Sequence, residues 1–309
     1  MAGPSFRAAP VRVRVPATSA NLGPGFDAFG LALARYDEVV VRIAESGLHL
    51  DVAGESAEDV GARPAKNLVV RALRATFDAL GGQPRGLEVV CANRIPHGKG
   101  LGSSAAAIVA GVTAARNLVL GGMPDDDALA VAVDLEGHPD NVAAALYGGV
   151  TVAWRDEGAR PRAVRLEPHQ RLRPVAFVPA SRSSTAKSRR LLPETVPHTD
   201  AAYSAARAGL LTEALTRRPE LLLAATDDRL HQPYRATEMP RSAALVASFR
   251  ERGIPAVLSG GGPSVLAFLL DGDNLAADTL AKVPLGRGGW VRTPLAVDTT
   301  GATVVTTTA

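Results

Sequence analysis

The chain has 309 residues, of which 46% are hydrophobic, and its formal net charge is +3. This length predicts one large or two medium domains, and the hydrophobic share is large enough to form a buried core. No apolar run approaches the ~18 residues of a membrane helix, and residues 1–10 lack the apolar core of a signal peptide, so we expect no membrane partner.

The composition also bears on partners and compartment. Aromatic residues make up 4% of the chain and the basic residues are scattered, whereas nucleic-acid-binding proteins more often show a basic stripe with stacking aromatics. We therefore expect small anionic ligands and no nucleic acid. Cys91 is the one cysteine, which excludes an internal disulfide and fits a reducing cytoplasm. We expect it to be a small buried hydrophobe.

The first predicted strand leads into a turn-rich segment. Residues 11–15 alternate strictly between apolar and polar side chains, which predicts a strand with one buried face. Residues 16–30 then mix turn formers with Asn21 and Asp27, whose side chains can hold a polar ligand. A wide turn in which these two side chains only cap the backbone fits equally well.

Further strands and one helix are expected before residue 82. Residues 31–41 predict a strand region, with residues 39–43 as a hairpin partner, and residues 45–63 predict a polar surface excursion. Residues 67–77 have helical spacing and end at a pair of glycines, with Asn67 as the N-cap.

A glycine loop between a strand and a helix is the most informative feature of the sequence. Residues 87–92 predict a strand, and residues 105–120 predict a helix. Between them, three glycines at alternate positions allow tight turns and the close approach of a ligand. Ser103 and Ser104 stand where an N-cap belongs. A helix start is a ready anion site, and Lys99 adds a positive charge, so a nucleotide polyphosphate with magnesium fits this chemistry.

Two familiar phosphate-binding motifs do not match this loop. The lysine of a Walker A loop follows the last glycine, whereas Lys99 precedes Gly102, and the chain has no Gly-x-Gly-x-x-Gly run. A glycine-rich turn before an ordinary helix is the alternative.

A glutamate at the end of the next helix is the second chemical signal. Acidic residues at 125–127 predict a helix start, and the helix runs to about Glu136. The helix dipole disfavours a carboxylate at this end unless a cation compensates, which a magnesium ion would do. A solvated glutamate is the alternative. A short helix is expected to open at residues 137–141 and to stop at the next pair of glycines.

The polar, proline-containing stretch 156–168 predicts a domain boundary, so we expect domains over 10–165 and 166–300. Further strands are expected over 150–154, 174–179 and 290–297, and a strand–glycine turn–strand over 254–268. Helices are expected across 199–252 and over 275–282. A basic loop is expected over 181–190 and a frayed tail over 299–309. The basic loop and the glycine turn each have a plain structural interpretation, as a solvated loop and a simple hairpin.

Three stretches, in this order, resemble the motifs of the GHMP kinases. They are residues 16–27, 96–107 and 258–264, and the resemblance spans roughly residues 11–297. The first has the form typical of members that phosphorylate homoserine. The third departs from the family pattern, which more often has alanine where Gly261 stands.

The resemblance implies an α+β fold of two domains with the active site between them. The N-terminal domain would resemble domain 2 of ribosomal protein S5, and the C-terminal domain would be ferredoxin-like. The implied reaction transfers the γ-phosphoryl group of ATP to the side-chain hydroxyl of L-homoserine and gives O-phospho-L-homoserine, on the way to threonine. The family also implies Mg²⁺, a homodimer and a cytoplasmic location.

Site residues follow from the same resemblance, by matching motif. Ser104 and Glu136 would hold the magnesium ion. Asp27 would take the α-ammonium group of homoserine, and Arg189 and Arg235 would hold its carboxylate. The full substrate set is Asn21, Asp27, His138, Asn141, Arg189 and Arg235. The nucleotide set is Asn67, Pro96, His97, Gly98, Lys99, Gly100, Leu101, Gly102, Ser103, Ser104, Ala105 and Ala106.

The implied catalytic residues are Asp140, Asn141 and Lys99, and each assignment has an alternative or an open question. Asp140 matches an aspartate proposed as a base elsewhere in the family, whereas an N-cap of the helix at Asn141 is the structural alternative. Lys99 either acts on phosphate or faces solvent. His138 either orients substrate or is a structural histidine.

Two other functions compete with this interpretation. The first is a GHMP kinase for a mevalonate-type or sugar alcohol, against which Asp27 argues because mevalonate has no ammonium group. The second is a non-catalytic RNA-binding protein that shares the S5-like half, against which Ser104 and Glu136 argue because RNA binding needs neither.

Overall fold

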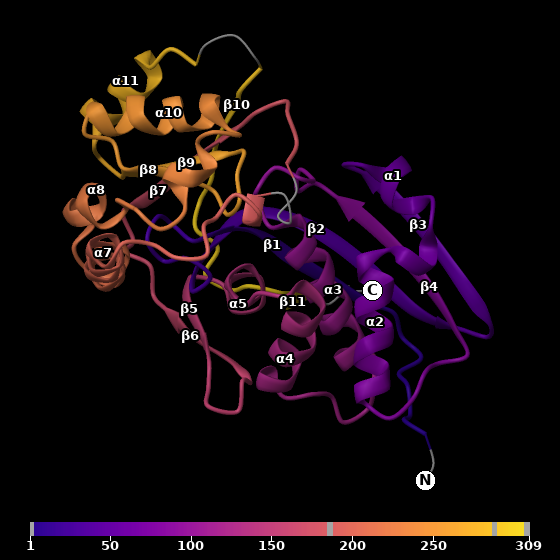
Figure 1. The fold of residues 1–309 in the computed structure, drawn as a ribbon. Coiled ribbons are helices and arrows are strands. Elements are labelled where there is room, and N and C mark those ends of the chain that lie inside the picture. Colours follow the sequence, from indigo (N-terminus) through magenta and orange to yellow (C-terminus); the bar gives the residue numbers. More distant parts are fainter. Residues whose placement is uncertain (1–2, 184–187, 286–288, 306–309) are drawn as a thin grey trace.

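The structure is a computed structural model, and it describes residues 3–183, 188–285 and 289–305. A larger and a smaller β-sheet lie side by side, each covered by helices (Figure 1). Within the described residues, no helix is both long and apolar enough to cross a bilayer.

The larger sheet has the strand order β11-β1-β2-β4-β3, with β5 and β6 attached to β2. Strand β3 runs parallel to β4, and the other neighbouring pairs are antiparallel. The strands are β1 (Val11–Ala20), β2 (Phe29–Ala44), β3 (Gly47–Gly54), β4 (Gly86–Asn93), β5 (Val150–Arg155), β6 (Pro161–Leu166) and β11 (Thr303–Val304).

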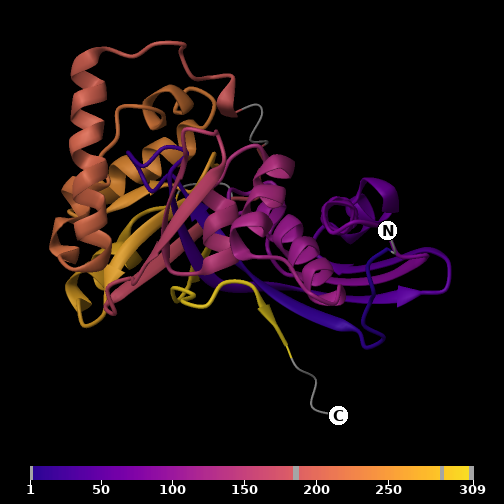
Figure 2. The same ribbon diagram turned by 90° about the horizontal axis from the view of Figure 1, so that it is seen from below.

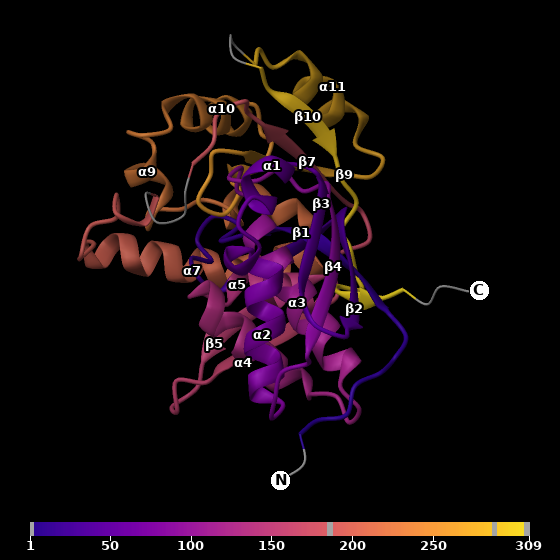
Figure 3. The ribbon, with the colours of Figure 1, turned by 90° about the vertical axis from the view of Figure 1, so that its right-hand side faces the viewer.

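Helices cover one face of this sheet, as the side view shows (Figure 3). Val13 of β1 and Val39 of β2 are paired partners, and both are buried beneath the helices. The strict alternation predicted for residues 11–15 is therefore confirmed. The helical segments of this half are α1 (Ala57–Gly61), η1 (Pro64–Lys66), α2 (Leu68–Ala79), α3 (Ser103–Leu118), α4 (Asp125–Glu136) and α5 (Asp140–Tyr147).

The smaller sheet has the strand order β10-β7-β9-β8. Helix α10 packs on it, where Phe177 and Phe249 meet with ring centroids 4.9 Å apart. Its strands are β7 (Leu172–Val178), β8 (Ala256–Leu258), β9 (Val265–Leu270) and β10 (Val291–Pro294). The helical segments of this half are α7 (His198–Thr216), η2 (Pro219–Leu221), α8 (Leu222–Ala225), α9 (Gln232–Arg235), α10 (Pro240–Glu251) and α11 (Asn274–Lys282). The glycine-turn hairpin predicted for 254–268 is confirmed.

Two sequence-based expectations about the fold are wrong, and the stretch predicted to hold a domain boundary contains a strand. The polar excursion at 45–63 contains β3 and α1, because β3 is an edge strand whose three apolar residues alternate with polar ones and give a weak signal. The polar stretch 156–168 contains β6, which pairs with β5. The expected frayed tail contains β11, whose Val304 pairs with Val13 (Figure 2, yellow segment). The domain boundary near residue 165 stays a prediction.

Candidate active site

The glycine loop joins β4 to α3 through left-handed backbone. Gly98, Gly100 and Gly102 have φ angles of +65°, +77° and +71°, a region that residues with a Cβ avoid. A Cβ on Gly102 would lie 1.9 Å from the side-chain oxygen of Thr18, and one on Gly100 would lie 2.3 Å from the carbonyl oxygen of Ser259. The predicted tight turns are confirmed, and the atoms that approach these glycines closely belong to the protein itself.

The N-cap of α3 is Gly102 and not one of the two serines. Because the loop enters the helix in a left-handed conformation, Ser103 and Ser104 become the first two helical residues. Gly102 has no side chain with which to cap the first amide groups of α3. Those amides form the positive end of the helix dipole. The helix start is therefore suited to anionic oxygens.

A cavity of about 260 Å³ lies beside this helix start, between the two halves of the molecule. It brings together the predicted metal and substrate residues from five separate stretches of chain. Those that line it are Asn21, Asp27, Ser104, Glu136, His138, Asp140, Asn141, Arg189 and Arg235, together with Gly98, Gly100, Gly102, Ser103, Ser183 and Gly260–Gly262. Residues 184–187 of the predicted basic loop lie outside the described residues.

Ser104 and Glu136 contact each other in this cavity. The hydroxyl of Ser104 donates to a carboxylate oxygen of Glu136 at 2.5 Å. Glu136 is the last residue of α4, and its side chain is only 10% exposed, so it is not the solvated glutamate of the alternative interpretation. Burial raises the pKa of Glu136, against the opposing effect of the Ser104 hydrogen bond. A cation would compensate this buried carboxylate.

Asp140 organises the neighbouring side chains. Its Oδ1 accepts the backbone N–H of Asn141 at 2.7 Å and lies 2.9 Å from Nδ1 of His138. Asn141 in turn accepts a hydrogen bond from Thr18 at 2.8 Å. Pro139 holds the N-cap position of α5, so the alternative that made Asp140 the N-cap is wrong.

His138 lies between two acids. Burial lowers the pKa of His138, but the hydrogen bond and charge of Asp140 and the charge of Glu136 outweigh burial and raise it overall. The imidazole of His138 lines the cavity and is held there by Asp140.

The two arginines of the cavity are held in different ways. Arg189 donates to both carboxylate oxygens of Asp27, at 2.9 and 2.5 Å. Arg235 is 2% exposed and has no carboxylate partner among the described residues; its Nη1 contacts His231 Nδ1 at 2.9 Å and the carbonyl oxygen of Gly260 at 3.0 Å. Burial, followed by the charge of Arg189, lowers the pKa of Arg235 to about 10. This buried cation thus lacks a matching anion.

Comparisons with known proteins identify the family. A model of the GHMP kinases N terminal domain matches residues 67–149, and one of the GHMP kinases C terminal region matches residues 203–282. The homoserine kinase of Streptomyces avermitilis is 59% identical over 308 residues, which cover 99% of each chain. That of Streptomyces coelicolor is 60% identical over 309 residues, covering 99% of this chain and 97% of the relative. The chain belongs to the homoserine kinases of the GHMP kinase family.

Solved structures agree with this assignment. The crystal structure of homoserine kinase from Cytophaga hutchinsonii superposes with a TM-score of 0.85 at 26% identity, covering 99% of this chain and 100% of that one. Mevalonate kinase of L. major, at 19% identity and a TM-score of 0.65, covering 97% and 100%, shares the fold. The predicted two-domain GHMP kinase fold is confirmed, and the mevalonate-type and RNA-binding alternatives are set aside.

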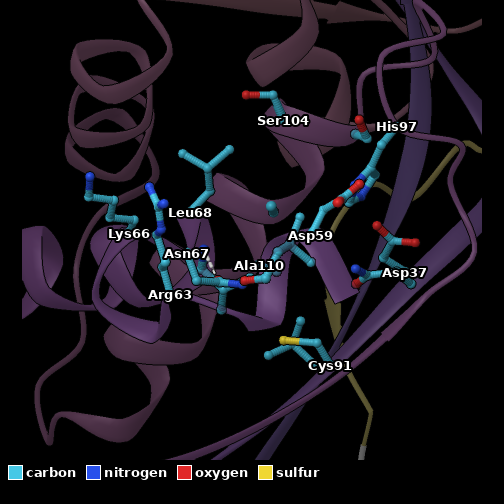
Figure 4. A pocket seen from close by; sticks show the side chains of 16 residues that line it. Asp37, Asp59, Arg63, Lys66, Asn67, Leu68, Cys91, His97, Ser104 and Ala110 are labelled. Carbon is cyan, nitrogen blue, oxygen red and sulfur yellow. Dashed lines mark hydrogen bonds between the residues drawn. The ribbon is translucent and has the colours of Figure 1, made fainter. Parts of the chain in front are cut away.

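A second cavity of this GHMP kinase, of about 350 Å³, shares Ser103 and Ser104 with the first (Figure 4). Its wall is largely apolar and includes Cys91, which is buried as expected. Asn67 lies at its edge and is the N-cap of α2, as predicted: its Oδ1 accepts from the amides of Val69 at 2.9 Å and Val70 at 3.4 Å.

Asp37 is a site residue that the sequence analysis missed. It is buried in β2, lines the second cavity, and accepts the amides of Arg94 at 2.6 Å and Ile95 at 2.8 Å. Burial raises the pKa of this carboxyl, and the two amide hydrogen bonds oppose it. Asp37 thereby fixes the start of the glycine loop. The available signal was a polar interruption, Arg35 to Glu38, within an otherwise apolar strand.

Both polar groups of the Asn21 side chain form hydrogen bonds with backbone atoms of the site. Its Oδ1 accepts the amide of Asp27 at 3.0 Å, and its Nδ2 donates to the carbonyl of Gly260 at 2.9 Å. Asn21, Leu22 and Asp27 all have positive φ, so the first motif is a strained turn. The capping interpretation of Asn21 is the one that fits its contacts.

The other predicted residues of the glycine loop differ in how they meet the cavities. The ammonium group of Lys99 donates to three carbonyls, those of Pro179 at 2.8 Å, Ala180, and Ser181 at 2.7 Å, so the structure does not bring it into either cavity. His97 lines the second cavity. The side chains of Pro96, Leu101, Ala105 and Ala106 are buried.

Proposed function

We propose that this chain transfers the γ-phosphoryl group of ATP to the side-chain hydroxyl of L-homoserine, with the residues of the two cavities in defined roles. The observation that supports this most is the set of charges in the smaller cavity. It presents three carboxylates (Asp27, Glu136 and Asp140), two guanidinium groups (Arg189 and Arg235) and an uncapped helix start, which together suit an amino acid beside a metal-bound polyphosphate.

We propose that ATP occupies both cavities. Its triphosphate would lie against the start of α3, and its adenosine would enter the second cavity. Ser103 and Ser104, which both cavities share, would lie where the two parts of ATP meet. The apolar wall around Val39, Leu68 and Ala110 suits a purine ring.

Ser104 and Glu136 would hold Mg²⁺. A hydroxyl and a carboxylate are hard oxygen ligands, and Mg²⁺ usually takes only one or two protein ligands and completes its shell with phosphate oxygens and water. The described residues contain no cluster of three or more His, Cys, Asp or Glu side chains able to cage a metal, which agrees with that mode of binding. When bound, the ion would neutralise charge on the phosphate oxygens.

L-homoserine would be held at both ends of its zwitterion. Asp27 would take the α-ammonium group, and Arg189 and Arg235 would take the carboxylate, with a charge-assisted hydrogen bond contributing about 1.5–3 kcal/mol. Asn141 and His138, oriented by Asp140, would face the reacting hydroxyl. Phosphoryl transfer asks the protein mainly for in-line positioning and charge neutralisation, which these groups supply. Lys99 would tether residues 179–181 and take no part in the chemistry.

The test is an ADP-release assay with a panel of hydroxylated acceptors. L-Homoserine should support turnover well above L-serine, L-threonine and (R)-mevalonate, and Glu136→Gln should abolish it. Preference for mevalonate would contradict the substrate, and ADP release that is independent of every acceptor would contradict kinase activity towards an alcohol.

The homodimer and the cytoplasmic location implied by the family stay predictions. Sedimentation equilibrium over a range of protein concentrations would test the first, and fractionation of cells that produce the chain would test the second.

A further inference from the structure

A fully buried histidine stands behind Arg235. His231 is 0% exposed and occupies the N-cap position of α9, one helical turn before Arg235. Its Nε2 lies 2.8 Å from the carbonyl oxygen of Gly23, in the first motif, and its Nδ1 lies 2.9 Å from Nη1 of Arg235. One imidazole therefore joins the substrate-side turn of the N-terminal half to the arginine of the C-terminal half.

The partners of this imidazole fix its tautomer. A carbonyl oxygen only accepts hydrogen bonds and a guanidinium group only donates them, so Nε2 carries the proton and Nδ1 accepts from Arg235. A carboxylate oxygen of Asp228 lies 3.4 Å from Nε2, on the side that carries the proton. Burial lowers the pKa of His231 to about 4, with Arg235 acting in the same direction and Asp228 against it. The imidazole is therefore neutral at physiological pH.

A neutral acceptor has a specific consequence for a ligand-binding arginine. A carboxylate in the place of His231 would hold Arg235 equally well but would cancel its charge, as Asp27 does for Arg189. The imidazole fixes the guanidinium and leaves its positive charge for an incoming anion. Both protons of Nη1 are used, on His231 and on Gly260, while Nε has no partner among the described residues. Arg235 lines the cavity and its Nη2 makes no hydrogen bond to the described residues, so Nη2 is the donor left for a carboxylate.

We propose that His231 is the positioning residue for Arg235, which fixes the guanidinium without neutralising it and so sets the affinity for the substrate carboxylate. This inference rests on the proposed function, in which Arg235 binds the carboxylate of homoserine. It assigns a role to a buried polar residue that lies outside the three sequence motifs.

The packing around His231 supports a positioning role. The ring of Phe26 lies 5.3 Å from the imidazole, centroid to centroid, and 5.6 Å from the guanidinium carbon of Arg235. Gly23 packs so closely that a Cβ on it would lie 2.4 Å from the carbonyl oxygen of Thr226, so its carbonyl is held against His231. The closely packed carbonyl of Gly23 therefore holds the imidazole from the side opposite Arg235, and the ring of Phe26 packs against it.

The test compares His231→Leu with His231→Gln. Leucine removes both hydrogen bonds, whereas glutamine offers an acceptor oxygen and an N–H donor on a side chain of similar reach. We expect H231L to raise the KM for homoserine by about 10- to 100-fold, the range of a charge-assisted hydrogen bond, with the KM for ATP within about twofold of the wild type. H231Q should restore the KM for homoserine to within a few-fold. Equal rises in both KM values, or a failure of glutamine to rescue, would overturn the proposal.

A double variant separates positioning from general stability. If His231 acts through Arg235, H231L should add no more than about twofold to the KM for homoserine in an Arg235→Ala background, because there is no guanidinium left to position. A full additional loss there would overturn the proposal. If H231L does not fold, as judged by thermal unfolding, H231Q decides alone: a KM for homoserine near the wild type supports the proposal and a tenfold rise overturns it. Failure of the proposed function is distinguishable, because the wild type would then not phosphorylate homoserine or R235A would leave its KM unchanged.

Discussion

Arg189 and Asp27 neutralise each other through two hydrogen bonds, at 2.9 and 2.5 Å, although the proposed function gives each of them a different end of the substrate. Without substrate, the guanidinium of Arg189 stands in for an α-ammonium and the carboxylate of Asp27 stands in for an α-carboxylate. A zwitterionic ligand can replace both at once. A ligand with only one of the two charges breaks the ion pair and gives a new partner to only one of the two residues.

The first prediction concerns ligands with a single charge. Asp27→Asn should weaken L-homoserine binding by tenfold or more, because the ammonium loses its counter-ion. The same substitution should strengthen the binding of 4-hydroxybutyrate, which has a carboxylate and no ammonium, because Arg189 no longer has an internal partner. Isothermal titration with both ligands measures these opposite shifts.

The control for this prediction is the complementary variant. Arg189→Gln should weaken homoserine and improve 3-amino-1-propanol, which has an ammonium and no carboxylate. If D27N weakened homoserine and left 4-hydroxybutyrate unchanged, Asp27 would bind the ammonium without competing for Arg189.

The second prediction concerns the glycine that caps α3. Gly102→Ala should reduce both thermal stability and kcat/KM, because alanine at a φ of +71° is strained by about 1–2 kcal/mol and its Cβ would press on Thr18 at 1.9 Å. Thr18 donates a hydrogen bond to Asn141, so a displaced Thr18 would disturb the residue proposed to face the reacting hydroxyl of homoserine. Gly121→Ala is the matched control, since Gly121 has a φ of +105° and open space where the Cβ would go. Equal effects on kcat/KM from both variants would show that the close approach at Gly102 has no bearing on activity.

How far the sequence predicts this site depends on the range of the interactions. Asn67 as a helix cap, and Glu136 at a helix end, follow from local rules because the signal and its structural consequence lie within one helical turn. The left-handed glycines were likewise predictable as a group from their spacing. The assignment of the cap to Gly102 was not, because it depends on how the loop packs against Thr18, far away in the sequence.

The missed residues share a physical cause. Asp37 and His231 belong to no recognised motif, and each acquires its role from a partner brought close by the fold. His231 lies 208 positions from Gly23 in the sequence, so no local pattern connects them. The ion pair of Asp27 with Arg189 is hidden for the same reason, even though both residues were identified individually.

The third prediction concerns Asn67, which the family resemblance assigns to the nucleotide. Asn67→Ala should lower the free energy of unfolding by about 1 kcal/mol, because two amides of α2 lose their cap. Asn67→Asp keeps the acceptor and should retain most of this stability, losing only the weak contact of Nδ2 with Val60 at 3.3 Å. Urea unfolding measures both. Because these contacts use the amide on protein groups, the KM for ATP should be unchanged in N67D; a clear rise would instead indicate a direct contact with the base.

The fourth prediction addresses Asp140, which the family resemblance offers as a base. Its Oδ1 is engaged by Asn141 and by His138, contacts that an asparagine oxygen can also accept, so Asp140→Asn should preserve the local geometry. If Asp140 chiefly orients these neighbours, kcat should fall by less than about 100-fold, whereas loss of a general base typically costs about 10²–10⁴-fold.

Asp140→Asn should also change the pKa of His138. Burial lowers the pKa of His138, and Asp140 is the main group that raises it above its ordinary value. Removing the Asp140 charge should therefore lower the pKa of His138, and the imidazolium would lose its proton at a lower pH than in the wild type. NMR titration of the imidazole, carried out with the kinetic measurement, checks this. A lowered pKa with a kcat within 100-fold would assign Asp140 to positioning, and a kcat loss beyond about 1000-fold with an unchanged KM for homoserine would make it the proton acceptor.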